Sequence, residues 1–143
     1  MPLYPVDLSV PASTPSDCPV KHEVDVEGDY LTRVEVLFPP GCCCLVGFQL
    51  RYGEMPLLPS DPDAYVKGDG ETVRADMRWR IPERRARLTL LAYNADELYD
   101  HTLYVRLYTA WEHEMEPTGL QARMARLLVA FLEHVLGLRR GRR

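Results

Sequence analysis

Hydrophobic and polar residues alternate with a period of two over several stretches of the chain. The clearest is residues 72–81, where Val73, Ala75, Met77, Trp79 and Ile81 are separated by polar side chains. Successive side chains of a strand point to opposite faces, so this alternation predicts a β-strand with one buried face. The same pattern predicts strands at residues 20–27, 30–38, 44–52, 87–93 and 102–111, with a weaker one at 55–58.

The last two of these strands flank a short polar segment. Leu103, Val105, Leu107 and Trp111 share one face of the second strand, and the connection Asn94–Asp100 is rich in Asn and Asp. These residues favour turns, because their side chains bond to nearby backbone groups. We therefore expect residues 88–111 to form a β-hairpin at the centre of the fold.

The turn signals are spaced at intervals of about ten residues, which is typical of sandwiches and barrels. The sequence thus predicts an all-β fold, an antiparallel β-sandwich of six to eight strands over residues 20–111. The pattern does not separate jelly-roll from immunoglobulin-like connectivity.

Both ends of the chain differ from this body. Residues 1–19 contain five prolines and predict an extended N-terminal arm without regular structure, whereas residues 112–119 read as an acidic linker. Residues 120–143 predict a C-terminal apolar helix with a basic tail. Its apolar residues recur at threes and fours, which suits one helical face: Leu120, Met124, Leu127, Leu128, Phe131, Val135 and Leu138.

The run at residues 127–132 is apolar without a break, so the apolar surface is wider than one stripe. Such a helix is buried on more than one side. The sandwich can cover one side, and we expect copies of the same helix or another protein on the other. These seven apolar residues are therefore the predicted oligomer interface.

Charge is divided unevenly along the chain. Residues 1–116 hold 11 Lys and Arg against 20 Asp and Glu, a net charge of −9, and residues 117–143 carry +5. The tail residues Arg139, Arg140, Arg142 and Arg143 predict an anionic partner, either an acidic protein surface or nucleic acid. The chain shows neither a signal peptide nor a membrane-spanning run, so we expect cytoplasmic synthesis.

The sequence contains four cysteines and four histidines, side chains that can bind metals or act in catalysis. Cys42, Cys43 and Cys44 lack the spacing of a zinc site and predict small apolar residues at the start of a buried strand, with a disulfide to Cys18 left open. His22 and His101 share the inward parity of their strands, which predicts partly buried, hydrogen-bonded side chains. No nucleophile elbow accompanies Asp100 and His101, so we expect no enzyme. No two histidines have the spacing of a helical metal site, and there is no Gly-rich phosphate loop or dinucleotide fingerprint, so we expect neither a metal nor a cofactor.

Tyrosines mark the outer face of the expected hairpin. Tyr93, Tyr104 and Tyr108 would present aromatic surface there, which suits a protein interface or a stacked sugar. This face predicts an alternative function, that of a carbohydrate- or peptide-binding module.

Three segments carry a resemblance to a known class of proteins: Phe38–Gly41 (FPPG), Ala92–Asp96 (AYNAD) and His101–Val105 (HTLYV). Within a sandwich of this size they resemble the small β-sandwich structural proteins of tailed-phage particles, such as head decoration or head–tail joining proteins. The resemblance implies a non-enzymatic structural subunit located in a virion. Together with the two terminal extensions, it makes a subunit of a homo-oligomer or virion-like assembly the first hypothesis for this chain.

Overall fold

The computed structural model describes residues 1–115 and 119–136 of the 143-residue chain. These residues divide into two compact units, Met1–Glu112 and His113–Arg143. The strands of the first unit are β1 (Leu3–Val10), β2 (Val20–Glu27), β3 (Tyr30–Phe38), β4 (Val46–Tyr52), β5 (Met55–Leu58), β6 (Val66–Lys67), β7 (Glu71–Arg80), β8 (Arg85–Asn94) and β9 (His101–Ala110).

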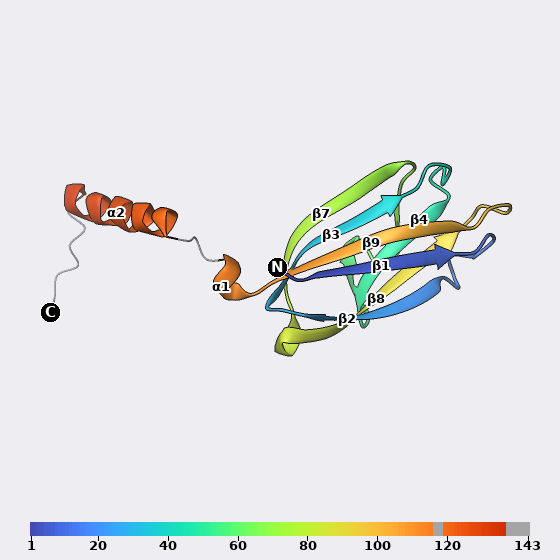
Figure 1. The fold of residues 1–143 in the computed structure, drawn as a ribbon, viewed down its shortest axis with the longest axis horizontal. Coiled ribbons are helices and arrows are strands. Elements are labelled where there is room, and N and C mark those ends of the chain that lie inside the picture. The colour runs from blue at the N-terminus through green and yellow to red at the C-terminus, as the bar shows by residue number, and fades with distance from the viewer. Residues whose placement is uncertain (116–118, 137–143) are drawn as a thin grey trace. The chain divides into compact units, whose positions relative to one another are not determined.

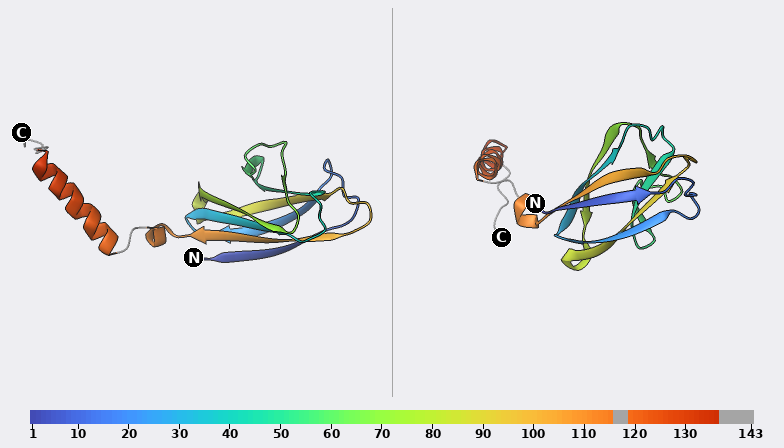
Figure 2. Two further views of the ribbon diagram at one scale, coloured as in Figure 1. Left: turned by 90° about the horizontal axis from the view of Figure 1, so that it is seen from above. Right: turned by 45° about the vertical axis from the view of Figure 1, so that its right-hand side comes forward.

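The strands form two antiparallel sheets. One has the order β1-β9-β3-β7, and these strands lie side by side in Figure 1. The other has the order β2-β8-β4-β5, with β6 paired to β4, and Figure 2 shows both sheets from two further directions. Side chains from the two sheets share one hydrophobic core, which includes Val36, Phe48, Leu88 and Leu107. The expected β-rich fold with two antiparallel sheets and a C-terminal helix is therefore confirmed.

The predicted buried faces hold for most strands. Val46, Phe48 and Leu50 of β4 are fully buried, as are Leu88, Leu90 and Ala92 of β8. In β3 the prediction fails at the first residues, because Leu31 is buried in place of Tyr30 and Thr32. The pairing register with β9 shifts between Leu31 and Arg33, and the one extra residue on β3 reverses which side chains point inward.

The strand pairs are nested along the sequence. The β4–β5 hairpin lies innermost, and β3 pairs with β7, β2 with β8 and β1 with β9 around it. The two halves of the chain therefore run antiparallel to each other as one long ribbon. This ribbon bends so that alternate strand pairs fall in opposite sheets. Within the four-stranded sheet, the pairing of β3 with β9 joins the β3–β7 pair to the β1–β9 pair. Within the five-stranded sheet, the pairing of β4 with β8 joins the β4–β5 pair to the β2–β8 pair.

The expected central hairpin is wrong. β8 belongs to the five-stranded sheet and β9 to the four-stranded sheet, so residues 95–100 cross from one sheet to the other. The alternation predicts the buried face of most strands, but it specifies only which face is buried. It carries no information on which strand lies alongside.

The N-terminal arm is also corrected. Leu3–Val10 form β1, which pairs with β9 over its whole length, from Leu3 opposite Tyr108 to Val10 opposite His101. Val6, Leu8 and Val10 are buried in the core. The prolines mislead because β1 is an edge strand, where Pro5 is tolerated without interrupting an inner ladder.

The second unit contains the helix expected at the C-terminus. α1 (Glu112–Met115) opens the predicted linker, and α2 (Leu120–Val135) is a helix of 16 residues. The expected helix extended to Leu138, which lies with the basic tail outside the described residues. Within residues 1–115 and 119–136, no helix has the length and apolar character needed to cross a membrane.

Candidate functional site

α2 exposes large apolar side chains on most of its surface. None of its residues is buried, and nine apolar side chains from residue 120 to 136 are each between 42% and 72% exposed. They are Leu120, Met124, Leu127, Leu128, Val129, Phe131, Leu132, Val135 and Leu136. A contiguous exposed apolar surface of this kind marks a site of interaction.

The apolar surface wraps around the helix. At about 100° per residue, the side chains from Leu127 through Phe131 to Val129 cover an arc of about 200°. Gln121 is the one polar residue that we find in this arc among residues 120–136. Arg126 and Glu133 lie on the remaining side. A single neighbouring element cannot cover such an arc, because a helix packed on one side needs a stripe of only about 100°.

The predicted interface residues therefore share one exposed helix, apart from Leu138, which is not described. The prediction missed Val129, Leu132 and Leu136. Their signal was present in the unbroken apolar run at residues 127–132. Apolar residues spaced three and four apart define a single stripe of the helix. This spacing does not include the residues that make the apolar surface wider than that stripe.

The predicted tyrosine face is divided between the sheets. Tyr104 and Tyr108 lie on the outer face of the four-stranded sheet, where Tyr104 is 43% exposed. Tyr93 lies on the five-stranded sheet, is buried, and packs edge-on against Tyr65 at a centroid distance of 4.8 Å. The three tyrosines therefore do not share one face, because β8 and β9 do not form a hairpin.

The outer face of the four-stranded sheet is organised in cross-strand rows. One row runs from Pro5 on β1 through Arg106 and Glu35 to Arg74 on β7. The Glu35 side chain is only 7% exposed and accepts hydrogen bonds from Arg74 at 2.9 Å and from the Tyr108 hydroxyl at 3.0 Å. This carboxylate holds two neighbouring rows of polar side chains in fixed positions.

A hollow of 290 Å³ opens beside this row. It is lined by Leu37, Tyr104 and Arg106, together with Pro5 and Asp7 of the edge strand and Val105. Asp7, Tyr104 and Leu37 are direct cross-strand neighbours in the adjacent row. The hollow thus combines an aromatic ring, a carboxylate and a guanidinium on rigid strands.

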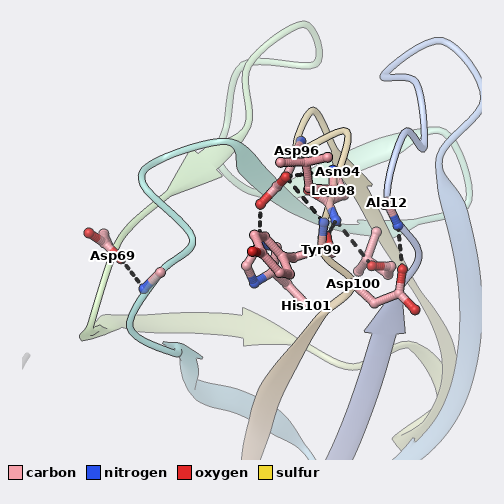
Figure 3. A network of polar contacts seen from close by, with 10 residues as sticks. Ala12, Asp69, Asn94, Asp96, Leu98, Tyr99, Asp100 and His101 are labelled. Atoms are coloured by element: carbon pink, nitrogen blue, oxygen red, sulfur yellow. Dashed lines mark hydrogen bonds and ion pairs between the residues drawn. The ribbon is translucent and has the colours of Figure 1, made fainter.

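A second polar group lies at the end of the sandwich that carries the β8–β9 connection (Figure 3). His101 contacts Asp96 at 2.9 Å, and Asp96 also accepts hydrogen bonds from the backbone N–H groups of Leu98 and Tyr99. These donors, the Leu98 N–H first, hold the pKa of Asp96 below its ordinary value of 3.8. Asp100 instead accepts a hydrogen bond from the Ala12 N–H at 2.7 Å, so it does not orient His101.

These contacts have a structural effect. Asn94 is fully buried, and its side-chain NH2 group donates to the backbone carbonyls of Val10 and Tyr99. Its side-chain oxygen Oδ1 accepts a hydrogen bond from the Asp96 N–H. The loop is therefore fixed from within while Tyr99 remains 67% exposed at its tip. The hydrogen-bonded role expected for His101 is confirmed, whereas His22 is exposed despite its inward parity.

The cysteines fit their predicted role only in part. All four are free thiols. Cys42 is buried, and burial raises the pKa of its thiol. Cys43 and Cys44 are exposed, with positive φ angles of 49° and 58°. The buried strand begins only at Val46, so these two residues form a turn that precedes it.

Two predictions are left, the anionic contact of the basic tail and the absence of a metal site. Arg139, Arg140, Arg142 and Arg143 are outside the described residues. In the described part of the chain no group of His, Cys, Asp and Glu side chains is placed to hold a metal ion. Neither the protein-family models nor the curated proteins compared with the chain give a match.

Proposed function

We propose that this protein is a non-enzymatic structural subunit that assembles with copies of itself through α2. The observation that carries the proposal is the exposed apolar arc of this helix, in which nine large side chains are between 42% and 72% exposed. Burying such surface is the main favourable term in protein association, at about 25 cal/mol per Å².

The helix also needs partners for its own stability. α2 has 16 residues, and Gly119 at its N-terminus provides no side-chain capping bond. Most of the stability of a helix in a protein comes from the packing of its apolar face rather than from helix propensity. Because the arc spans about 200°, one partner helix would leave part of it exposed. A trimeric or larger bundle of α2 helices covers it.

The architecture of the first unit supports a subunit role. We propose that its sheets form a jelly roll, since the nested pairs β1–β9, β2–β8, β3–β7 and β4–β5 are what a doubled ribbon wrapped into two sheets requires. Jelly rolls build viral capsid and lectin domains, among others. A fold alone does not assign a function. The virion-like particle suggested by the sequence resemblance is nevertheless compatible with this architecture.

The two ends of the chain have different roles in the proposed assembly. β1 is already paired with β9 in its own chain, so we assign no association role to residues 3–10. The basic tail at residues 139–143 remains a proposed contact for an acidic surface, and residues 1–116 with their charge of −9 provide one.

The test is the solution mass of the full-length protein, measured by light scattering at several concentrations. We expect a discrete multiple of 16.4 kDa, trimeric or larger. Leu128→Asp places a charge at the centre of the apolar arc and should yield monomers. Arg126→Asp, on the polar side of the same helix, is the matched control and should leave the assembly intact.

Three results would contradict the proposal. A full-length protein that stays monomeric at high concentration would show that α2 does not associate with itself. Monomers that sediment with anionic lipid vesicles would identify a membrane surface as the partner of the helix. An assembly that survives deletion of residues 117–143 would place the contact on the sandwich.

A further inference from the structure

The hollow on the four-stranded sheet has walls of three chemical kinds. The Tyr104 ring provides an aromatic surface, Asp7 a carboxylate that only accepts hydrogen bonds, and Arg106 a guanidinium that only donates them. Tyr104 and Arg106 are two residues apart on β9, which places their backbones about 7 Å from each other. This separation matches one six-membered sugar ring lying against the tyrosine.

The guanidinium of Arg106 is available for a ligand. It is 57% exposed and lies 3.9 Å from Glu35, whereas Arg74 bonds the same carboxylate at 2.9 Å. Arg74 and Tyr108 therefore satisfy most of the hydrogen-bonding capacity of Glu35. Arg106 can keep its long contact with Glu35 and direct other N–H groups toward the hollow.

The opposite charges in the hollow narrow the class of ligand. Asp7 would repel an anion, and Arg106 would repel a cation. An apolar ligand would displace water from both side chains without replacing the hydrogen bonds that the water makes. A neutral sugar has hydroxyls that donate to Asp7 and accept from Arg106, and its C–H face stacks on an aromatic ring. We infer that the four-stranded sheet carries a site for a neutral carbohydrate, formed by Asp7, Tyr104 and Arg106.

The size of the hollow limits the strength of binding. At 290 Å³ it is at the lower end of ligand pockets, which run from about 300 to 1,000 Å³, and holds one sugar unit or the end of a chain. We therefore expect a dissociation constant for single sugars of about 1 mM. Every residue of the site belongs to Met1–Glu112, so sugar binding does not require α2.

The experiment is saturation-transfer NMR on the full-length protein, a method that works for large assemblies. The probes are the methyl glycosides of glucose, galactose, mannose and N-acetylglucosamine, each up to about 50 mM, well above the expected dissociation constant. At least one glycoside should receive saturation on its ring protons. Tyr104→Ala should weaken that binding at least tenfold, and Asp7→Asn, which keeps the size of the side chain, should weaken it severalfold.

Tyr99→Ala is the matched control, because Tyr99 is an exposed tyrosine on the β8–β9 loop outside the hollow. It should leave sugar binding unchanged. Equal losses in the Tyr99 and Tyr104 variants would overturn the inference, as would the absence of transfer to all four glycosides. Transfer to a peptide probe alone would assign the hollow to protein recognition instead. Circular dichroism of each variant shows whether its sheets have folded.

Discussion

Glu35 and Arg74 face each other across β3 and β7, and two guanidinium nitrogens of Arg74 lie 2.9 Å from the same carboxylate oxygen. The carboxylate is almost completely buried on a face that is otherwise open to solvent. It is therefore the fixed point to which the arginines and Tyr108 of that face are attached.

Removing this carboxylate should destabilise the sandwich. Glu35→Ala leaves Arg74 and the Tyr108 hydroxyl without their common acceptor, and we expect the free energy of unfolding to fall by about 1–2 kcal/mol, because Arg74 is partly solvated. Urea unfolding at a fixed protein concentration measures the change. Asp76→Ala is the control, since its pair with Arg33 is exposed and should contribute less than about 0.5 kcal/mol. Equal effects would contradict the special role of Glu35.

Gly47 allows the Tyr93 ring to lie against the β4 backbone. A Cβ at this position would overlap Cε1 of Tyr93 and lie 2.7 Å from Cζ and 2.9 Å from Cβ of Tyr65. Gly47→Ala should therefore lower the free energy of unfolding by about 1–3 kcal/mol through overpacking. Adding Tyr93→Ala removes the overlap with the Tyr93 ring, the closest of these contacts, so the double variant should be more stable than the sum of the two single changes predicts. Strict additivity in thermal unfolding would contradict this account.

Gln49 holds the loop at residues 59–64 in place through hydrogen bonds to its backbone. It is fully buried and donates to the carbonyls of Pro62 and Ala64, while it accepts from Arg51 at 2.6 Å. Gln49→Leu keeps a side chain of similar size but removes the bonds to the Ala64 carbonyl and from Arg51 Nε, while Pro62 keeps its bond from Arg51, and should cost about 1–3 kcal/mol. Hydrogen exchange at the Asp63 and Ala64 amides measures the effect. These amides should lose protection before those of β8, and uniform loss across the sheet would exclude a local support.

Acid should loosen the β8–β9 loop through Asp96. Its pKa is lowered by the Leu98 N–H and by His101, so the folded state binds the proton less tightly than the unfolded state does. The stability contributed by Asp96 is then fully present above its ordinary pKa of 3.8 and is lost as the pH falls through the folded-state value. Thermal unfolding measured from pH 6 to pH 2 should fall less steeply in Asp96→Asn, and parallel curves would contradict the assignment.

Local patterns predicted the buried faces well and the strand partners poorly. The alternation of Val73 to Ile81 and of Leu103 to Leu107 follows from the geometry of a strand alone, so it can be read from the sequence. The pairing of β9 with β1 and β3 depends on residues far away in the sequence. No local signal specifies such partners, and the Asn94–Asp100 connection therefore resembled a hairpin turn.

β1 shows how composition can hide a pattern. Val6, Leu8 and Val10 alternate as clearly as any other strand, but the surrounding prolines suggested an irregular arm. Proline is a weak argument against an edge strand, because one side of such a strand has no ladder to lose. Strand partners also decide the composition of the candidate site on the four-stranded sheet. Without them, Tyr93 was expected on the same face as Tyr104. Asp7 was not predicted at all, because it is the β1–β9 register that brings it next to Tyr104.

The nested ribbon has a consequence for how the chain folds. β4 and β5 pair over a short separation, whereas β1 must find β9 about a hundred positions further along the chain. Such a high contact order places folding in the range of milliseconds to seconds. Each sheet also draws strands from both halves of the chain, so the five-stranded sheet cannot be completed on the ribosome before β8 has emerged, nor the four-stranded sheet before β9. We expect the edge at β1 to close last.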